Sequence, residues 1–338
     1  MKKTRKFLTV ILIIAAVFVA VRVFPLYKEY SGASVYTGQQ IEFEVKEGET
    51  VSTVASRLEQ MNIIKSKYSF ILRHKHSPKN YTDVKFGTYV IKHGMNLDDI
   101  IYTLTATGGK SDAVQVLIPE GFSAEMIGQR LENNGLCTKA DFLDSIENDT
   151  FDYEFINHIP DGDYTYKLEG FLFPSTYELS KDMTPHMIAD AMLSAFETAY
   201  TDKFSSYDRL FEIMTVASIV EREAVLDSER ATIAGVIGNR ISKDMLLQVD
   251  ATVVYAKSGG EYDINTVTYD DLEVDSKYNT YKYKGLTPGP ICNPGIKSIL
   301  AAAKPESHTY LFYHTDEAKK DGSHIFTETF DDHVATMN

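Results

Sequence analysis

The sequence has few of the residues that would indicate a disulfide framework or a metal centre. Only two of its 338 residues are cysteines, Cys137 and Cys292, and their spacing fits no metal-ligand pattern. The nine histidines are scattered, and neither an HExxH nor a GxSxG motif occurs. We therefore interpret the cysteines as small, partly buried apolar residues, and the sequence predicts no metal site and no cofactor.

An excess of positive charge is also absent. The net charge is -14 at pH 7, and five basic residues fall within the first 22 positions, so the remainder is still more acidic. Nucleic acid is not an expected partner, because its phosphates would be repelled over most of such a surface. The segment GGKS at 108–111 lacks the first glycine of a phosphate loop, since Leu104 stands there.

One long apolar run is present, at the N-terminus. Residues 1–6 carry four basic side chains, and the apolar run that follows over 7–24 is broken only by one threonine and one arginine. At about 1.5 Å per residue it reaches roughly 27 Å, which predicts a transmembrane anchor behind a cytoplasmic tail. A cleavable signal peptide is the alternative, but residues 18–25 lack a clear pair of small residues for cleavage. Both interpretations place the chain from Leu26 onward outside the cytoplasm.

The next part of the chain contains a repeated pattern of strand, turn and helix. A polar stretch at 25–39 predicts a linker. The pattern occurs as IEFEVKEGETVSTVASRLEQMNII (41–64), more loosely as FGTYVIKHGMNLDDIIYTLT (86–105), and again as VQVLIPEGFSAEMIGQRLENNGL (114–136). Thr50, Asn96 and Ser123 are the expected helix N-caps. The first copy resembles a LysM-like module, a fold that binds N-acetylglucosamine polymers.

The predicted fold class is α+β, with the transmembrane helix, a small LysM-like domain at 40–112 and a larger mixed catalytic domain at 113–338. Within the larger domain the periodicity predicts helices over 180–200, 208–225 and 227–240. From Leu246 onward we expect short β-like runs separated by turns.

Glu221 is the carboxylate that this pattern singles out. On a helix over 208–225 it lies in the middle of an apolar stripe with Leu210, Met214 and Ala217, whereas Glu223 points almost the opposite way. A carboxyl group in apolar surroundings either holds a proton or is paired. The first state suits the general acid of glycoside cleavage, and the second would make Glu221 a core residue paired with an arginine such as Arg230 or Arg240.

Several separate blocks of sequence carry a family resemblance. They are KLEGFLFPSTY (167–177), VASIVEREA (216–224), GVIGNRI (235–241), LQVDATVVYA (247–256), SKYNTYKYKGLTPGPICNPG (276–295), SILAAAKP (298–305), YLFY (310–313) and GSHIFTETFDDH (322–333). In this order they resemble the YceG-like family of endolytic murein transglycosylases. Three departures are Arg222 for a frequent lysine, Gly238 for a bulkier residue and Ser175 for a common aspartate, and the last weakens any case for a second carboxylate there.

The resemblance implies a lytic cleavage of peptidoglycan glycan strands. Glu221, as the glutamate of the VASIVEREA block, would protonate the oxygen of the β-1,4 bond between N-acetylmuramic acid and N-acetylglucosamine. It would then deprotonate the muramoyl 6-hydroxyl, which closes a 1,6-anhydro ring. Glu169 is the second carboxylate considered, with a turn-holding role as its alternative. The side chains predicted along the glycan groove are Gln248, Asp250, Tyr278, Asn279 and Tyr281, for which turn capping or surface packing is the alternative.

The resemblance also implies partners and a location. The expected partners are peptidoglycan, the cytoplasmic membrane and the penicillin-binding wall synthases, and the expected location is the cell membrane with the catalytic domain outside. Two other functions remain open from the residues: a muramidase that uses water and releases reducing ends, and a non-catalytic scaffold that binds the cell wall.

Overall fold

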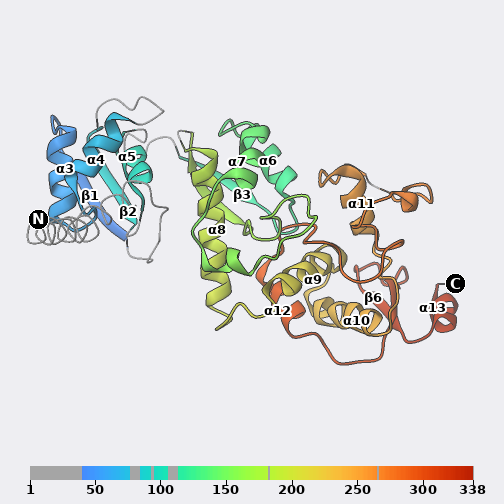
Figure 1. The fold of residues 1–338 in the computed structure, drawn as a ribbon. Helices are drawn as coiled ribbons and strands as arrows, with labels where there is room; N and C mark the ends of the chain where they lie inside the picture. Colours follow the sequence, from blue (N-terminus) through green and yellow to red (C-terminus); the bar gives the residue numbers. More distant parts are fainter. Residues whose placement is uncertain are drawn as a thin grey trace, which may run out of the picture. The chain divides into compact units, whose positions relative to one another are not determined.

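The computed structural model describes residues 40–76, 84–92, 95–105, 113–181, 183–264 and 266–337, whose elements are labelled in Figure 1. The chain divides into two units. The N-terminal unit comprises the described residues up to Ala113 together with Thr150–Asp152. The C-terminal unit comprises Val114–Asp149 and the chain from Tyr153 onward. Each unit contains its own hydrophobic core and is described by itself.

The N-terminal unit follows the order strand, helix, helix, strand, helix. Its elements are β1 (Gln40–Val45), α3 (Val51–Gln60), α4 (Lys67–Lys75), β2 (Gly87–Lys92) and α5 (Leu97–Thr105), and β1 pairs antiparallel with β2. The Thr50 hydroxyl accepts the backbone N–H of Thr53 at the start of α3. Asn96 accepts the N–H of Asp99 at the start of α5, at 2.8 Å. Both N-caps were predicted from the sequence and are confirmed.

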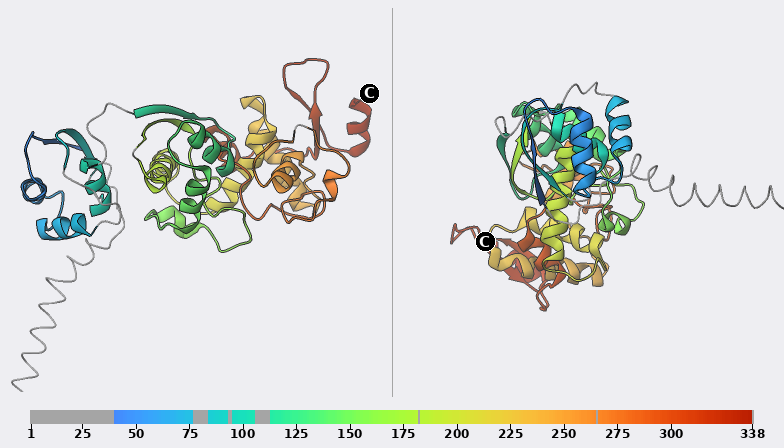
Figure 2. Two further views of the ribbon diagram at one scale, coloured as in Figure 1. Left: turned by 90° about the horizontal axis from the view of Figure 1, so that it is seen from above. Right: turned by 90° about the vertical axis from the view of Figure 1, so that its left-hand side faces the viewer.

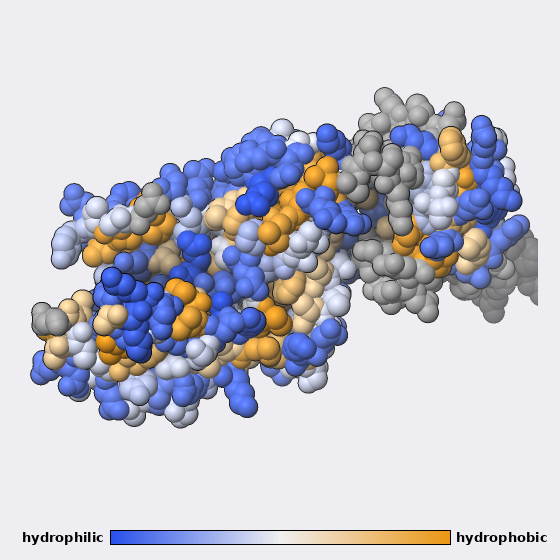
Figure 3. All heavy atoms as spheres, turned by 180° about the vertical axis from the view of Figure 1, so that it is seen from behind, coloured by the Kyte–Doolittle hydropathy of each residue, from blue (hydrophilic) through white to orange (hydrophobic). Residues whose placement is uncertain are grey.

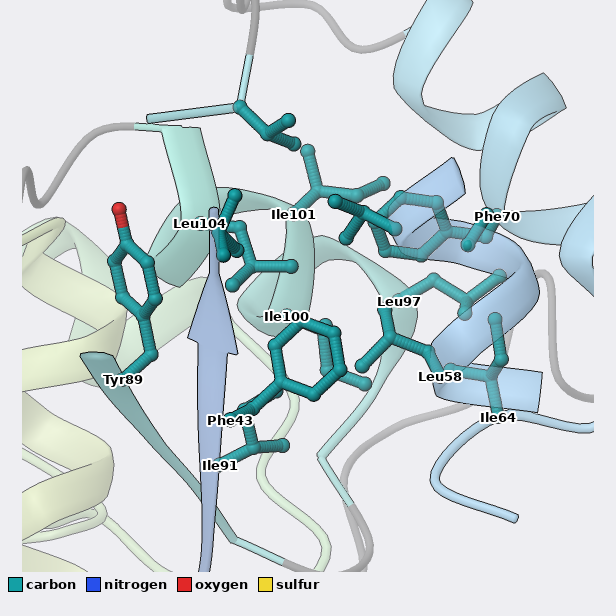
Figure 4. Packing of buried hydrophobic residues seen from close by; sticks show 14 residues of the cluster. Phe43, Leu58, Ile64, Phe70, Tyr89, Ile91, Leu97, Ile100, Ile101 and Leu104 are labelled. Carbon is teal, nitrogen blue, oxygen red and sulfur yellow. The ribbon is translucent and has the colours of Figure 1, made fainter. Parts of the chain in front are cut away.

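The core of this unit lies between the two strands and the three helices (Figure 4). Phe43 of β1 and Tyr89 of β2 are register partners, so their side chains share one face of the sheet. Leu58 of α3, Phe70 of α4 and Ile100 of α5 pack with them and are fully buried. Burying each of these large side chains contributes on the order of 1.5–3 kcal/mol. Every element of the unit therefore contributes to one core.

The C-terminal unit contains mainly helices. Its elements are β3 (Ala113–Ile118), α6 (Ala124–Asn133), α7 (Lys139–Asn148), η2 (Glu154–His158), β4 (Ser175–Ser180), α8 (Pro185–Thr201), α9 (Leu210–Glu223), η3 (Asp227–Glu229), α10 (Arg230–Ser242), α11 (Asp250–Ser258), η4 (Asp271–Glu273), α12 (Ile296–Ala303), β5 (Phe312–Thr315), β6 (His324–Thr327) and α13 (Phe330–Thr336). β3 pairs with β4, and β5 forms an antiparallel hairpin with β6. The Ser123 hydroxyl caps α6, as predicted.

Helix α9 is central to the packing of this unit. It packs against α10, α11 and α12, and Figures 1 and 2 show α9, α10 and α12 close together. Ile219 and Val220 of α9 share a buried cluster with Ile233 and Ile237 of α10. Tyr313 of the β5–β6 hairpin packs against the same cluster. The C-terminal end of α9 is thereby held between helices and the hairpin.

The structure confirms some of the predicted elements and corrects others. The helices predicted over 208–225 and 227–240 are α9 and α10, the latter preceded by the short turn η3. The helix predicted from Ser180 begins later, at Pro185, because Ser180 ends β4 and Thr184 provides the N-cap. The expectation of only short β-like runs after Leu246 is wrong, since α11, α12 and α13 lie in that region.

The predicted fold class also needs correction. The mixture of helices and strands agrees with the structure, but the transmembrane part of the prediction does not. None of the helices in the described ranges is long and apolar enough to cross a membrane. Residues 7–24, to which that helix was assigned, lie outside the described residues. The fold is accordingly stated as two mixed units of helices and strands.

Hydrophilic residues predominate on the face of the molecule shown in Figure 3, and apolar residues form separate patches among them. This agrees with the acidic composition of the chain, whose net charge is -14.

Candidate active site

Two glutamates stand in the last turn of α9 and face different surroundings. The helix ends at Glu223, where the backbone N–H of Ala224 still bonds the carbonyl of Val220. Positions 221 and 223 are about 200° apart around a helix. Their partners therefore come from different parts of the chain.

Glu221 is held in an ion pair. Its side chain is only 6% exposed, and Arg230 Nη1 donates to Oε1 at 3.1 Å. The backbone N–H of Gly295 donates to Oε2 at 3.0 Å. Arg230 is fixed in turn by Asp227, 3.1 Å from Nε, and by the Ser298 hydroxyl, 2.6 Å from Nη1. Both oxygens of Glu221 are thus occupied by donors, which corresponds to the paired state that the sequence had left open.

The surroundings of Glu223 favour the protonated form of its carboxyl group. It is half-buried, and the Tyr313 hydroxyl donates to its Oε2 at 2.8 Å. Burial raises the pKa of Glu223, and the charge of Asp250 acts in the same direction. The Tyr313 bond and the neighbouring His324 and Arg222 oppose this rise, but the net pKa shift is upward.

A cavity of about 530 Å³ lies beside Glu223. Three of the residues predicted along the glycan groove line it: Gln248, Asp250 and Tyr281. The remaining wall comes from α10, from the β5–β6 hairpin and from α13, and it includes Arg240 and His333. Polar groups that converge on a cavity of this size are typical of a ligand site.

The Gln248 turn is fixed by the segment that carries Tyr281. The backbone N–H of Gln248 donates to the carbonyl of Thr280 at 3.1 Å, and that of Val249 donates to the Thr280 hydroxyl at 2.9 Å. The Tyr281 hydroxyl donates to Asp250 Oδ1 at 2.5 Å. Gln248 itself has a φ of 52°, in the left-handed region that non-glycine residues rarely adopt. Such strain is found preferentially at functional sites.

The other two residues predicted along the glycan groove, Tyr278 and Asn279, are buried. Tyr278 is 5% exposed, and its hydroxyl accepts the backbone N–H of Thr165 at 3.3 Å. Asn279 is fully buried and donates to the carbonyls of Leu272 and Val274. Their side chains hold the loop that presents Tyr281, so the structure does not bring them to the cavity.

Glu169 is also internal. It is 1% exposed and accepts the backbone N–H of Ala124 at 3.1 Å. Asn293 Nδ2 donates to Oε1 at 2.9 Å, and the Tyr255 hydroxyl lies 3.3 Å from Oε2. Burial raises the pKa of Glu169 to about 8. These contacts correspond to the turn-holding alternative for this residue.

The cysteines are free thiols. Cys292 is buried and donates to the carbonyl of Ser218, and Cys137 is half-buried, which agrees with their interpretation as small apolar residues. Across the described ranges, no group of three or more His, Cys, Asp or Glu side chains is arranged to hold a metal ion.

The sequence had set Glu223 aside because it lies opposite the apolar stripe of α9. The groups that cover this opposite face, Tyr313 and His324, come from β5 and β6, far along the chain. The sequence signal that points to Glu223 is its spacing of two residues from Glu221. A second glutamate at the very end of the helix, two positions after Glu221, must face a different set of neighbours.

Comparisons with known proteins match nearly the whole chain. Residues 43–338 match the YceG-like family. The endolytic murein transglycosylase of Bacillus subtilis is 34% identical over 306 residues, which cover 87% of this chain and 82% of that protein. The enzyme of the same name from Streptococcus pneumoniae is 29% identical over 313 residues, or 86% of this chain and 56% of its own length. The crystal structure of a yceG-like protein from Listeria monocytogenes, 31% identical, superposes with a TM-score of 0.59 over 88% of this chain and 99% of that one.

Proposed function

Because the chain belongs to the YceG-like family, we propose that the cavity at the end of α9 is where it cleaves the glycan strands of peptidoglycan. The protein is an endolytic murein transglycosylase, the activity for which its curated relatives are named. It cuts the β-1,4 bond between N-acetylmuramic acid and N-acetylglucosamine within a strand and leaves a 1,6-anhydro ring on the muramoyl product.

One observation carries the assignment of the acid: Glu223 is a carboxyl group of raised pKa beside a polar cavity. General acids of glycoside cleavage are kept protonated near neutral pH by such surroundings. Glu221 is a poorer candidate, because Arg230 and the Gly295 N–H already occupy its two oxygens. We therefore move the predicted role of Glu221 to Glu223.

The chemistry needs a single proton carrier. Glu223 gives its proton to the glycosidic oxygen as the bond from that oxygen to the muramoyl C1 breaks. The resulting carboxylate takes the proton of the 6-hydroxyl as O6 bonds to C1, which closes the anhydro ring. The acid is regenerated, and no water is consumed.

Mass spectrometry of digested peptidoglycan tests this function. The wild-type protein should release products with anhydro-muramic ends, whereas reducing ends would indicate a muramidase and an absence of cleavage would indicate a scaffold. Glu223→Gln preserves the volume of the side chain but cannot transfer the proton. It should lower anhydro product formation by several orders of magnitude with the fold retained. Normal product formation by this variant would disprove the role of Glu223.

The N-terminal unit supports a second, non-catalytic role. Its strand–helix–helix–strand order and its own core fit the LysM-like module suggested by the sequence. We propose that this unit binds N-acetylglucosamine-containing strands and retains the enzyme on the cell wall.

The substrate also suggests where the protein works. Peptidoglycan lies outside the cytoplasm, so we propose that both units act there, near the membrane at which wall synthases such as the penicillin-binding proteins produce new strands. A phosphatase that is active only outside the cytoplasm, fused after Asn338, should then be active in cells. An inactive fusion of normal abundance would argue against this location.

A further inference from the structure

Two carboxylates face the same cavity in unlike surroundings. Glu223 comes from the end of α9, is half-buried and accepts the Tyr313 hydroxyl. Asp250 comes from the first turn of α11, is exposed and accepts the Tyr281 hydroxyl. Both line the 530 Å³ cavity. In glycosidases, two carboxylates whose environments differ in this way divide the acid and the charge-stabilising roles between them.

Asp250 is held firmly in place. It occupies the first position of α11, where the positive end of the helix dipole favours a negative charge. Burial and the bond to Asp250 raise the pKa of Tyr281, so its hydroxyl keeps its proton and remains a donor. Thr280 fixes the turn before Asp250 through Val249 and also bonds the Thr252 hydroxyl at 2.9 Å. The carboxylate is thus oriented by the Tyr281 hydroxyl on a fixed backbone turn, an arrangement that reduces the reorganisation needed during a reaction.

Several other charged or titratable groups surround this pair of carboxylates. They are Arg222 on α9, Arg240 on α10, Tyr281 in the segment between η4 and α12, Tyr313 and His314 on β5, His324 on β6 and His333 on α13. Arg240 donates to the carbonyls of Leu246, Leu247 and Leu311. His324 lies 2.7 Å from Glu229.

We propose that Asp250 is a second catalytic carboxylate, which stabilises the positive charge that develops on the muramoyl C1 while Glu223 transfers the proton. This inference rests on the proposed function. Bond cleavage at C1 passes through a state with oxocarbenium character, and a carboxylate near C1 lowers its energy. Asp250 forms no bond to C1, because O6 of the same sugar takes that position. Its second effect is on Glu223, whose pKa it raises.

Asp250→Asn tests the proposal in the full-length protein. The change removes the charge and keeps the size, so kcat for anhydro product formation should fall by about 10²–10³-fold with KM changed little. Because the charge that raises the pKa of Glu223 is lost, the alkaline limb of the kcat profile should also move to lower pH. Tyr281→Phe keeps the carboxylate but removes its donor, and kcat should fall by roughly tenfold.

Glu178→Gln is the matched control, because it removes an exposed carboxylate on β4 of the same unit. Its kcat, KM and pH profile should equal those of the wild type. Unchanged kcat and pH profile in folded Asp250→Asn would overturn the proposal, as would a rise of KM alone, which would make Asp250 a binding residue. Should Asp250→Asn fail to fold, an unchanged kcat in Tyr281→Phe would overturn it instead. A fully active Glu223→Gln would refute the proposed acid separately.

Discussion

Glu221 and Glu223 show how two identical side chains on one helical turn acquire different roles. Arg230 donates to one carboxylate oxygen of Glu221 and the backbone N–H of Gly295 donates to the other, so each oxygen has a donor. Glu223 accepts the Tyr313 hydroxyl and lies beside a cavity. The hydrogen-bond partners of the two glutamates, more than their exposure, therefore distinguish Glu221 as a structural residue from Glu223 as the proposed acid.

The ion pair of Glu221 leads to a prediction about stability. Glu221→Gln removes the buried partner of Arg230 and leaves Asp227 and Glu120 as the neighbouring negative charges, so the free energy of unfolding should fall by ~3 kcal/mol. The folded variant should still form anhydro products at a near-normal rate. The thermal midpoint, together with product formation measured well below the melting range, checks this. Loss of products at unchanged stability would return the catalytic role to Glu221.

Sequence reasoning could find part of this site. The groove residues Gln248, Asp250 and Tyr281 follow from the family blocks, and the structure brings all three to one cavity. Helix periodicity indicates that Glu223 faces other neighbours than Glu221, but it does not identify them, because it contains no information about Tyr313 on β5. Whether any of these residues binds glycan stays a prediction.

At the scale of elements, Glu169 joins three segments of the C-terminal unit. Its carboxyl group bonds the first N–H of α6, the hydroxyl of Tyr255 on α11, and Asn293 in the loop before α12. Asn293 extends the junction by bonding the carbonyl of Phe122. One buried acid thus fixes the relative positions of two helices and a loop.

This junction predicts a dependence of stability on pH. Burial raises the pKa of Glu169 from 4.5 to about 8, so between these values the folded protein binds a proton that the unfolded chain has lost. Stability from this group is therefore complete below pH 4.5, and it declines by about 1.4 kcal/mol for each unit as the pH rises towards 8. Glu169→Gln should remove this decline. Urea unfolding at pH 5 and pH 8 measures it, and equal slopes in both proteins would contradict the assignment.

The elements that were predicted correctly are those with local signals. Thr50, Asn96 and Ser123 cap their helices through bonds to residues three positions away. Helix α11 was missed, because its run of β-branched residues favours a strand locally. The helix forms since Val253 and Tyr255 are buried in the core, a stabilisation that comes from distant segments.

At the scale of the whole molecule, the two separate cores predict separable functions. A chain lacking residues 40–112 should keep the core around α9 and retain cleavage of glycan strands. It should bind insoluble peptidoglycan more weakly, because the proposed glycan-binding unit is gone. Co-sedimentation with cell wall and product analysis give the two readouts. Wild-type sedimentation of the shortened protein would refute the binding role.

The left-handed backbone at Gln248 implies a trade-off between thermal stability and catalytic activity. A non-glycine residue in that region costs on the order of 1 kcal/mol, which glycine would not incur. Glycine would, however, leave the cavity without the amide at this position. Variants selected for heat resistance alone should therefore accumulate glycine at 248 and cleave more slowly, whereas selection for cell-wall turnover should keep the strained glutamine.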